Sequence, residues 1–225
     1  MIEAVLAETP LCLDRALSLG AMLHCPVISA SDPKPKAYLA VSPTHLEVRQ
    51  ASTKPILVDF LAPKFLHRLH STRARDPLLR AVDLKPHMPR TIIDATAGFG
   101  IDACMLAYAG AHVTLVERDP IMGLLLQDGI LRAQTSGELK AVANRMHVVL
   151  FDAKDYLKTL SASDHPDVIY LDPMFVHSKS ALPNKNMQFL QQQAGLSHDA
   201  DALLNLACDV ARQRVVVKRA LQAPP

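Results

Sequence analysis

From Thr91 onward the chain alternates short apolar runs with stretches suited to helices, and this alternation constrains the fold more than any other feature. The apolar runs predict strands at 91–94, 111–117, 146–151, 167–171 and 214–218. The stretches between them predict helices at 102–109, from 120 to about 133, and from 199 to about 212. Such alternation is typical of a parallel sheet with helices on both faces. The sequence therefore predicts an α/β fold, a doubly wound, Rossmann-like and mostly parallel sheet, over residues 91–225.

The first 60 residues have a different pattern and predict a small N-terminal α/β subdomain. A helix is expected at 14–23, and short strands at 26–29, 37–41, 46–49 and 55–60. Residues 61–90 are expected to be a partly helical connector, and this is the most basic part of the chain. Its basic residues are Lys64, Arg68, Arg73, Arg75, Arg80, Lys85 and Arg90. Two interpretations stay open, a solvated helix face and a surface that contacts phosphates.

Composition excludes several classes of protein. The net charge of +2 is too small to indicate a nucleic-acid binder by itself. The four cysteines form no C-x-x-C pair, so neither a zinc site nor a disulfide framework is expected. The N-terminus lacks the pattern of a signal peptide, and no apolar run is long enough to span a membrane. We expect a cytoplasmic protein with buried free thiols and no metal.

A glycine-containing turn follows the first strand of the predicted sheet. Its glycines, Gly98 and Gly100, allow a tight turn and close approach of the backbone to a ligand, and Asp102 lies where the next helix begins. The following strand ends in Glu117 and Arg118, and an acid at that distance is suited to bind ribose hydroxyls. These features predict an adenosine-containing cofactor, but NAD, FAD and S-adenosylmethionine fit them equally well.

Acidic residues end the first four strands of the predicted sheet: Asp94, Glu117, Asp152 and Asp172. An isolated acid at a strand end is usually a cap or turn residue. Four acids on one rim are more consistent with a ligand site, because open α/β sheets bind ligands beyond the carboxyl ends of their strands. A carboxylate at Asp152 suits the exocyclic amine of adenine, which together with the fourth strand end favours S-adenosylmethionine over NAD.

The fourth strand runs into Asp172, Pro173, Met174 and Phe175, a sequence with the chemistry of amine methylation. The exocyclic amine of a nucleobase is a poor nucleophile, because its lone pair is delocalised into the ring. A carboxylate and a backbone carbonyl beside that amine accept its N–H groups and favour the tetrahedral nitrogen. Pro173 shapes the corner, and Phe175 is suited to stack on the base. We expect Asp172, Pro173 and Phe175 to be the catalytic residues.

Several motifs, in order along the chain, resemble those of the RsmJ family of ribosomal RNA small-subunit methyltransferases. They are DATAGFGIDA from Asp94, VERDP from Val116, YLDPMF from Tyr170, KSAL from Lys179, DADALL from Asp199 and RVVVKR from Arg214. The resemblance covers roughly residues 40–225 and implies a class I methyltransferase fold. It also implies S-adenosylmethionine-dependent methylation of the N2 amine of guanosine 1516 in 16S rRNA.

The resemblance places cofactor contacts on three pairs and one acid, namely Ile101 with Asp102, Glu117 with Arg118, Asp152 with Ala153, and Asp172. The chain departs from the family at Ile101, where an arginine is usual. The family's C-terminal strand pair is also expected to be missing, because this sequence stops soon after the fifth predicted strand.

An rRNA substrate, free or in the small ribosomal subunit, would require basic residues near the site. Those expected to contact RNA are Arg73, Arg75, Lys179, Lys185, Lys218 and Arg219. Three alternatives remain open: an amino-methyltransferase acting on adenine or glutamine, an NAD-dependent oxidoreductase, and a non-enzymatic RNA-binding module. The sequence does not predict the oligomeric state.

Overall fold

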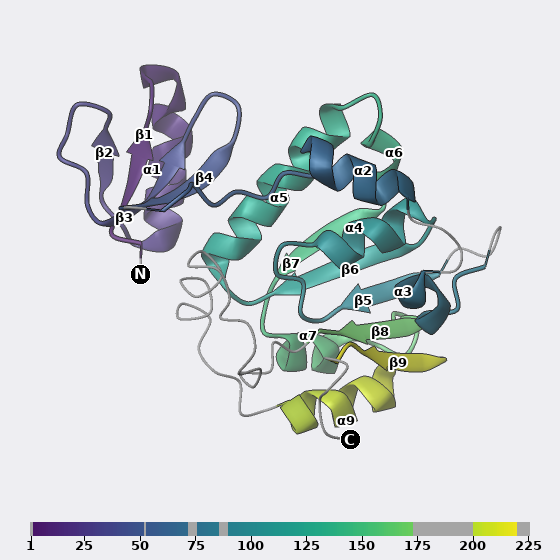
Figure 1. Cartoon of the computed structure of the whole chain (residues 1–225). Helices are drawn as coiled ribbons and strands as arrows, with labels where there is room; N and C mark the ends of the chain where they lie inside the picture. The colour runs from purple at the N-terminus through teal and green to yellow at the C-terminus, as the bar shows by residue number, and fades with distance from the viewer. Residues whose placement is uncertain (1, 52, 72–75, 86–89, 173–199, 220–225) are drawn as a thin grey trace.

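The computed structural model describes residues 2–51, 53–71, 76–85, 90–172 and 200–219 and contains two β-sheets (Figure 1). A four-stranded sheet has the order β2-β1-β3-β4, and a five-stranded sheet has the order β7-β6-β5-β8-β9. The larger sheet carries the strand ends that the sequence predicts to be functional.

Every strand pair in the larger sheet is parallel, as the sequence predicts. Its strands are β5 (Thr91–Asp94), β6 (His112–Glu117), β7 (Met146–Leu150), β8 (Val168–Leu171) and β9 (Arg214–Val217). Because the strands are parallel, their carboxyl ends share one edge. The predicted α/β fold is confirmed.

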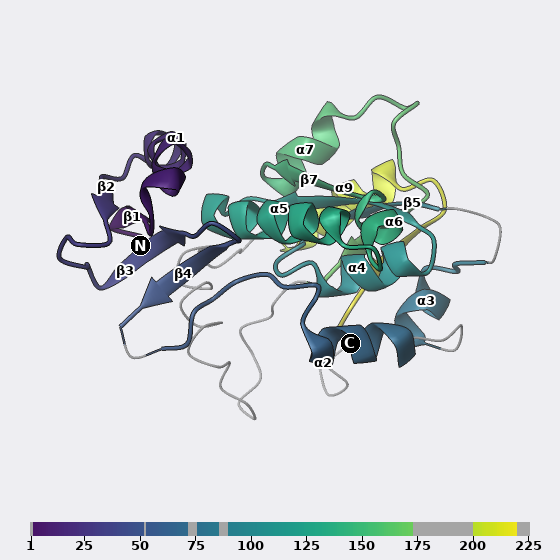
Figure 2. The same ribbon diagram turned by 90° about the horizontal axis from the view of Figure 1, so that it is seen from above.

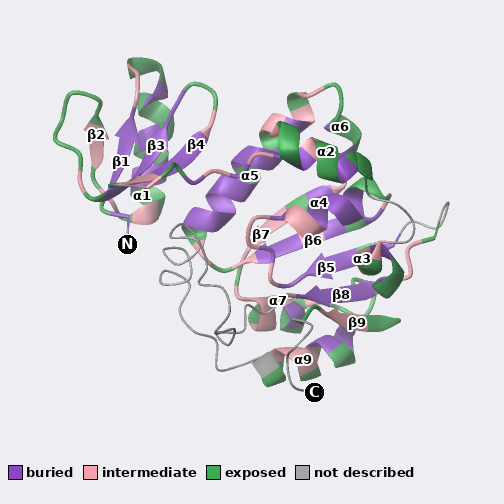
Figure 3. Cartoon of the chain, in the orientation of Figure 1, coloured by how far each residue is buried: buried purple, intermediate pink, exposed green. Residues whose placement is uncertain are grey.

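Helices cover both faces of this sheet (Figure 2). They are α4 (Ile101–Tyr108), α5 (Pro120–Thr135), α6 (Lys140–Ala143), α7 (Ala153–Thr159) and α9 (Ala200–Val210). Successive strand residues pack against opposite faces: Ile92 belongs to the core that α4 and α5 complete, whereas Ile93 belongs to the core with α7 and α9. The central strands β5 and β8 are therefore almost entirely buried, whereas the edge strands β7 and β9 are mostly half-buried (Figure 3).

Two helices on the carboxyl side of the sheet begin at aspartates that follow strands. Asp119 accepts a hydrogen bond of 2.8 Å from Met122 N, and Pro120 occupies the first position of α5, as the sequence predicts. Asp152 accepts a hydrogen bond of 2.9 Å from Lys154 N and caps α7, a helix that the sequence analysis did not predict. The strand-end acid Asp152 thus also begins a helix.

The N-terminal sheet contains β1 (Ala4–Ala7), β2 (Val27–Ser29), β3 (Ala37–Val41) and β4 (Leu46–Gln50). The short η1 (Pro10–Cys12) and α1 (Leu13–Leu23) connect its first two strands. Strand β1 lies parallel to both β2 and β3, and β3 forms an antiparallel pair with β4. The sequence analysis did not predict β1, because its alanine-rich four residues lack the β-branched pattern of a typical strand.

The strand predicted at 55–60 is wrong. In that segment only Ile56 pairs, through an isolated bridge to Val48 of β4. Val58 and Phe60 are also buried, so the apolar alternation reflects packing into the core without a strand partner. The chain then enters the predicted helical connector, in which α2 (Pro63–Ser71) and α3 (Pro77–Ala81) lie.

A buried aspartate on α5 joins the two sheets. Asp128 is only 4% exposed, and it accepts hydrogen bonds of 2.8 Å from Arg15 on α1 and 3.1 Å from Leu46 N on β4. Arg132, one turn later on α5, donates to the same carboxylate over 3.0 Å. One hydrophobic core runs across this junction. The N-terminal sheet and the larger sheet therefore share a core. The predicted domain boundaries, at 1–60, 61–90 and 91–225, remain a proposal.

Within the described part of the chain, no helix has both the length and the apolar character needed to cross a membrane.

We predict that Asp128→Asn lowers the free energy of unfolding by about 3 kcal/mol, because two arginines lose their buried partner. Urea denaturation monitored by circular dichroism measures this change. The exposed Glu3→Gln variant is the control and should change stability by less than about 0.5 kcal/mol. Equal midpoints for the two variants would contradict the assigned role of Asp128.

Candidate active site

The order of the strands changes direction between β5 and β8. The chain runs from β5 outward through β6 to β7, and it then returns to place β8 and β9 on the other side of β5. In open α/β sheets this switch point is where ligands bind, beyond the carboxyl ends of the strands. Asp94 ends β5 and Asp172 follows β8, so both predicted site residues lie at the switch point.

The glycine turn after β5 is held by Glu117 at the end of β6. Gly98 and Gly100 have positive φ angles of 50° and 67°. The Gly98 N–H donates to Glu117 Oε2 over 3.0 Å, and the Asp119 N–H donates to Glu117 Oε1 over 2.8 Å. At the positive φ of Gly100 a Cβ atom would be strained and would lie 2.6 Å from Leu126 Cδ1, so this position favours glycine. Glu117 thus shapes the turn, and its carboxylate has further lone pairs for ribose hydroxyls.

Burial raises the pKa of the two acids next to the glycine turn, Asp94 and Glu117. Asp94 is 2% exposed and accepts one hydrogen bond of 3.1 Å from Thr96 N. Burial raises the pKa of Asp94 to about 7, and the charges of Asp102, Asp172 and Glu117 add to this effect. Burial also raises the pKa of Glu117, against the backbone N–H groups that stabilise its ionised form. This end of the sheet is electrostatically suited to a cation.

Asp172 and Asp102 are connected through a lysine. Lys218 Nζ lies 2.7 Å from Asp172 Oδ2 and 2.7 Å from Asp102 Oδ2. The Tyr170 hydroxyl donates to Asp102 Oδ2 over 2.6 Å, and the Asp172 N–H donates to Thr96 Oγ1 over 2.7 Å. The predicted catalytic acid and the predicted cofactor acid therefore belong to one network.

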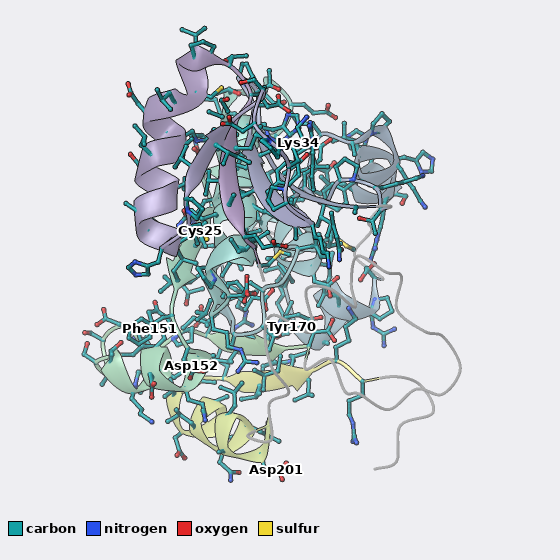
Figure 4. All side chains as sticks on the ribbon, turned by 90° about the vertical axis from the view of Figure 1, so that its left-hand side faces the viewer. Cys25, Lys34, Phe151, Asp152, Tyr170 and Asp201 are labelled. Carbon is teal, nitrogen blue, oxygen red and sulfur yellow. The ribbon has the colours of Figure 1, made fainter. Side chains whose placement is uncertain are left out.

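The other predicted cofactor residues lie along the same sheet edge. Ile101 begins α4, partly buried against the core, and Ala153 begins α7. Phe151 and Asp152 lie together at the end of β7, where Phe151 is 46% exposed (Figure 4). Arg118 follows Glu117 and is exposed. Their roles as cofactor contacts stay predictions.

Part of the predicted site falls outside the described residues. These residues are Arg73, Arg75, Pro173, Phe175, Lys179 and Lys185. Arg219 is described and exposed, whereas the ammonium of Lys218 is already engaged by two carboxylates. The expected RNA contacts of Arg219 and Lys218 stay predictions.

Sequence reasoning missed three members of the network: Thr96, Tyr170 and the bridging role of Lys218. Tyr170 carried a usable signal, because a tyrosine hydroxyl in an otherwise aliphatic buried strand needs a hydrogen-bond partner. Lys218 carried none, since the pairing of β9 with β8 that brings it to Asp172 is a property of the folded sheet.

Comparison with known proteins identifies the family. The SAM-dependent methyltransferase family model matches residues 25–225. Ribosomal RNA small subunit methyltransferase J from Coxiella burnetii is 40% identical and covers 99% of this chain and 88% of its own length. The Nitrosococcus oceani protein of the same name is also 40% identical, over 91% of this chain and 81% of its own length. The chain belongs to the ribosomal RNA small subunit methyltransferase J family.

A solved structure agrees with this assignment. A SAM-dependent methyltransferase from Neisseria gonorrhoeae matches with a TM-score of 0.74 and 28% identity, over 99% of this chain and 86% of that one. The class I methyltransferase fold and the resemblance to the RsmJ family are confirmed, and the cofactor is S-adenosylmethionine.

The residues present fit this cofactor. S-adenosylmethionine carries a sulfonium and an ammonium group, and the negative charges of Asp102, Asp172 and Glu117 all act on Asp94 at the switch point. Among the described residues no group of three or more His, Cys, Asp and Glu side chains is arranged to hold a metal ion.

We predict that Glu117→Gln weakens S-adenosylmethionine binding at least about tenfold, or about 1.4 kcal/mol. The amide offers one acceptor oxygen where the carboxylate serves two backbone N–H groups. Isothermal titration calorimetry measures the dissociation constant. Asp155→Asn on the exposed face of α7 is the control, and an unchanged constant for Glu117→Gln would refute the predicted contact.

We predict that Asp94→Asn stabilises the cofactor-free protein increasingly between about pH 4 and about pH 7. In this window an unfolded aspartate, whose pKa is about 3.9, loses its proton, whereas the folded carboxyl keeps it until its pKa of about 7. The native protein therefore loses stability as the pH rises through this window, and the variant does not. Melting temperatures of both proteins measure the difference; a gap that stays constant with pH would contradict the raised pKa.

Proposed function

We propose that this protein transfers a methyl group from S-adenosylmethionine to the N2 amine of a guanosine in 16S rRNA. The observation that carries the proposal is the position of Asp172 at the β5–β8 switch point, joined through Lys218 to the first turn of α4. An acceptor for the target amine thus lies beside residues expected to hold the methyl donor.

The chemistry of an exocyclic amine explains why a carboxylate is needed there. Asp172 accepts an N–H of the amine, which favours the tetrahedral nitrogen that attacks in line. The hydrogen bond from Asp172 N to Thr96 Oγ1 fixes the backbone of Asp172 against the turn after β5. No strong base is required, because the nitrogen becomes acidic once it is alkylated.

The cofactor supplies an electrophilic methyl group on a sulfonium. We expect residues of this chain to position that group: Glu117, which holds the glycine turn, would bind the ribose hydroxyls, and Asp152, next to the exposed Phe151, would bind the adenine amine. Positioning of this kind supplies much of the rate in a bimolecular displacement.

The choice of RNA rests on the relatives, whose names specify small-subunit ribosomal RNA. The choice of guanine N2 rests on the resemblance of several motifs, in order along the chain, to that family. Adenine N6 and a glutamine amide would suit the same acceptor chemistry, so a direct product analysis has to separate the three.

Methyl transfer to small ribosomal subunits, and to deproteinised 16S rRNA from cells that lack the activity, tests the proposal. We expect tritium from labelled S-adenosylmethionine to enter the RNA, and N2-methylguanosine to be the labelled nucleoside after digestion. Labelled N6-methyladenosine would overturn the assignment of the base. Label in ribosomal protein alone would overturn RNA as the substrate.

We predict that Asp172→Ala lowers kcat at least about 100-fold at saturating cofactor, because the target amine loses its acceptor. Asp172→Asn, which keeps one acceptor oxygen without the charge, should lie between Ala and the native protein. Single-turnover methyl transfer measures both rates. Full activity of Asp172→Ala would exclude Asp172 as the acceptor.

A further inference from the structure

Lys218 connects the ends of β8 and β9 with the first turn of α4, three segments that lie apart in the sequence. It follows β9, and its backbone N–H donates to Leu171 O over 2.8 Å, which fixes the lysine backbone at the end of β8. Its ammonium then lies between Asp102 in the first turn of α4 and Asp172 after β8, at 2.7 Å from each. The side chain is 52% exposed, so it lies on the solvent side of the network.

The charges around Lys218 are mainly negative. Besides its two partners, Asp94 on β5 interacts with both of those acids, and Glu117 on β6 interacts with Asp94. The neutral Tyr170 hydroxyl donates to Asp102, and the Arg68 guanidinium on α2 lies 4.0 Å from Asp102. Partial burial opposes the charge of Lys218, but its hydrogen bonds to Asp102 and Asp172 outweigh that effect and raise the pKa of Lys218.

Two adjacent carboxylates repel each other and, without a cation between them, would turn apart or share a proton. Lys218 is the described cation that contacts both Asp102 and Asp172 at hydrogen-bond distance. It engages Oδ2 of Asp172, and a carboxylate has enough lone pairs to accept an N–H elsewhere. The lysine therefore leaves Asp172 able to accept from a substrate amine.

We propose that Lys218 is a positioning residue for methyl transfer, which holds the Asp172 carboxylate in the orientation that accepts the target amine. This inference rests on the proposed role of Asp172, but it does not depend on which base carries the amine. It assigns to Lys218 a function inside the site in place of a contact with RNA phosphates.

Lys218→Met removes the ammonium and retains much of the apolar stem. We expect kcat to fall about 10- to 100-fold, while the KM for RNA and the calorimetric dissociation constant for S-adenosylmethionine change less than about threefold. Lys218→Arg should recover most of the lost rate, because a guanidinium also bridges two carboxylates. Lys158→Met, which breaks an exposed lysine–aspartate pair on α7, is the matched control and should have native kinetics.

A double-mutant cycle with Asp172→Asn separates positioning from a merely structural effect. If Lys218 acts through Asp172, adding Lys218→Met to Asp172→Asn should lower kcat less than about threefold further. A full additional loss in the double variant would overturn the proposal.

Two other results would also overturn it, and each has its own signature. A KM for RNA that rises and loses salt dependence in Lys218→Met would make Lys218 a phosphate contact. A cofactor dissociation constant that weakens more than tenfold, measured without RNA, would make it a cofactor contact. The double-mutant cycle can be measured with any RNA that accepts the methyl group, so a wrong base assignment leaves the test of Lys218 intact. An inactive native protein, in contrast, would count against the proposed function itself.

Discussion

Repulsion among carboxylates at the carboxyl edge of the larger sheet is the constraint on which the site depends. The charges of Asp102, Asp172 and Glu117 all act on Asp94 there, and the four carboxyl groups are stabilised in three ways. Burial raises the pKa of Asp94 to about 7, Glu117 accepts two backbone N–H groups, and Lys218 contacts both Asp102 and Asp172. Such an arrangement costs stability, and a cationic ligand offsets that cost when it binds.

The rest of the fold positions these groups. Parallel pairing brings the strand ends to one edge, and the switch in strand order brings β5 and β8 together there. The N-terminal sheet is connected to this scaffold through Asp128 and a shared core, so α5 serves both sheets. Membership of the ribosomal RNA small subunit methyltransferase J family is thus consistent with a site built at the place where its fold binds ligands.

Much of this site was predictable because strand ends are local features of the sequence. The acids at the ends of β5, β6, β7 and β8, the glycine turn and the Asp119 cap all follow from residue types at short spacing. The contacts of Asp172 with Thr96 and Lys218 were not predictable, since the pairing of β5 and β9 with β8 brings these distant residues to it. At 55–60 the sequence predicted too much: apolar residues do alternate there, but they are buried in the core and do not form a strand.

A crystal structure of the protein with S-adenosylhomocysteine most directly tests the claim that the β5–β8 switch point is the cofactor site. The account predicts that the ligand lies across the carboxyl ends of β5 and β8, with its ribose hydroxyls hydrogen-bonded to Glu117 and its amino acid portion beside Asp102 and Asp172. A ligand bound away from this edge, or a ribose that does not contact Glu117, would contradict it.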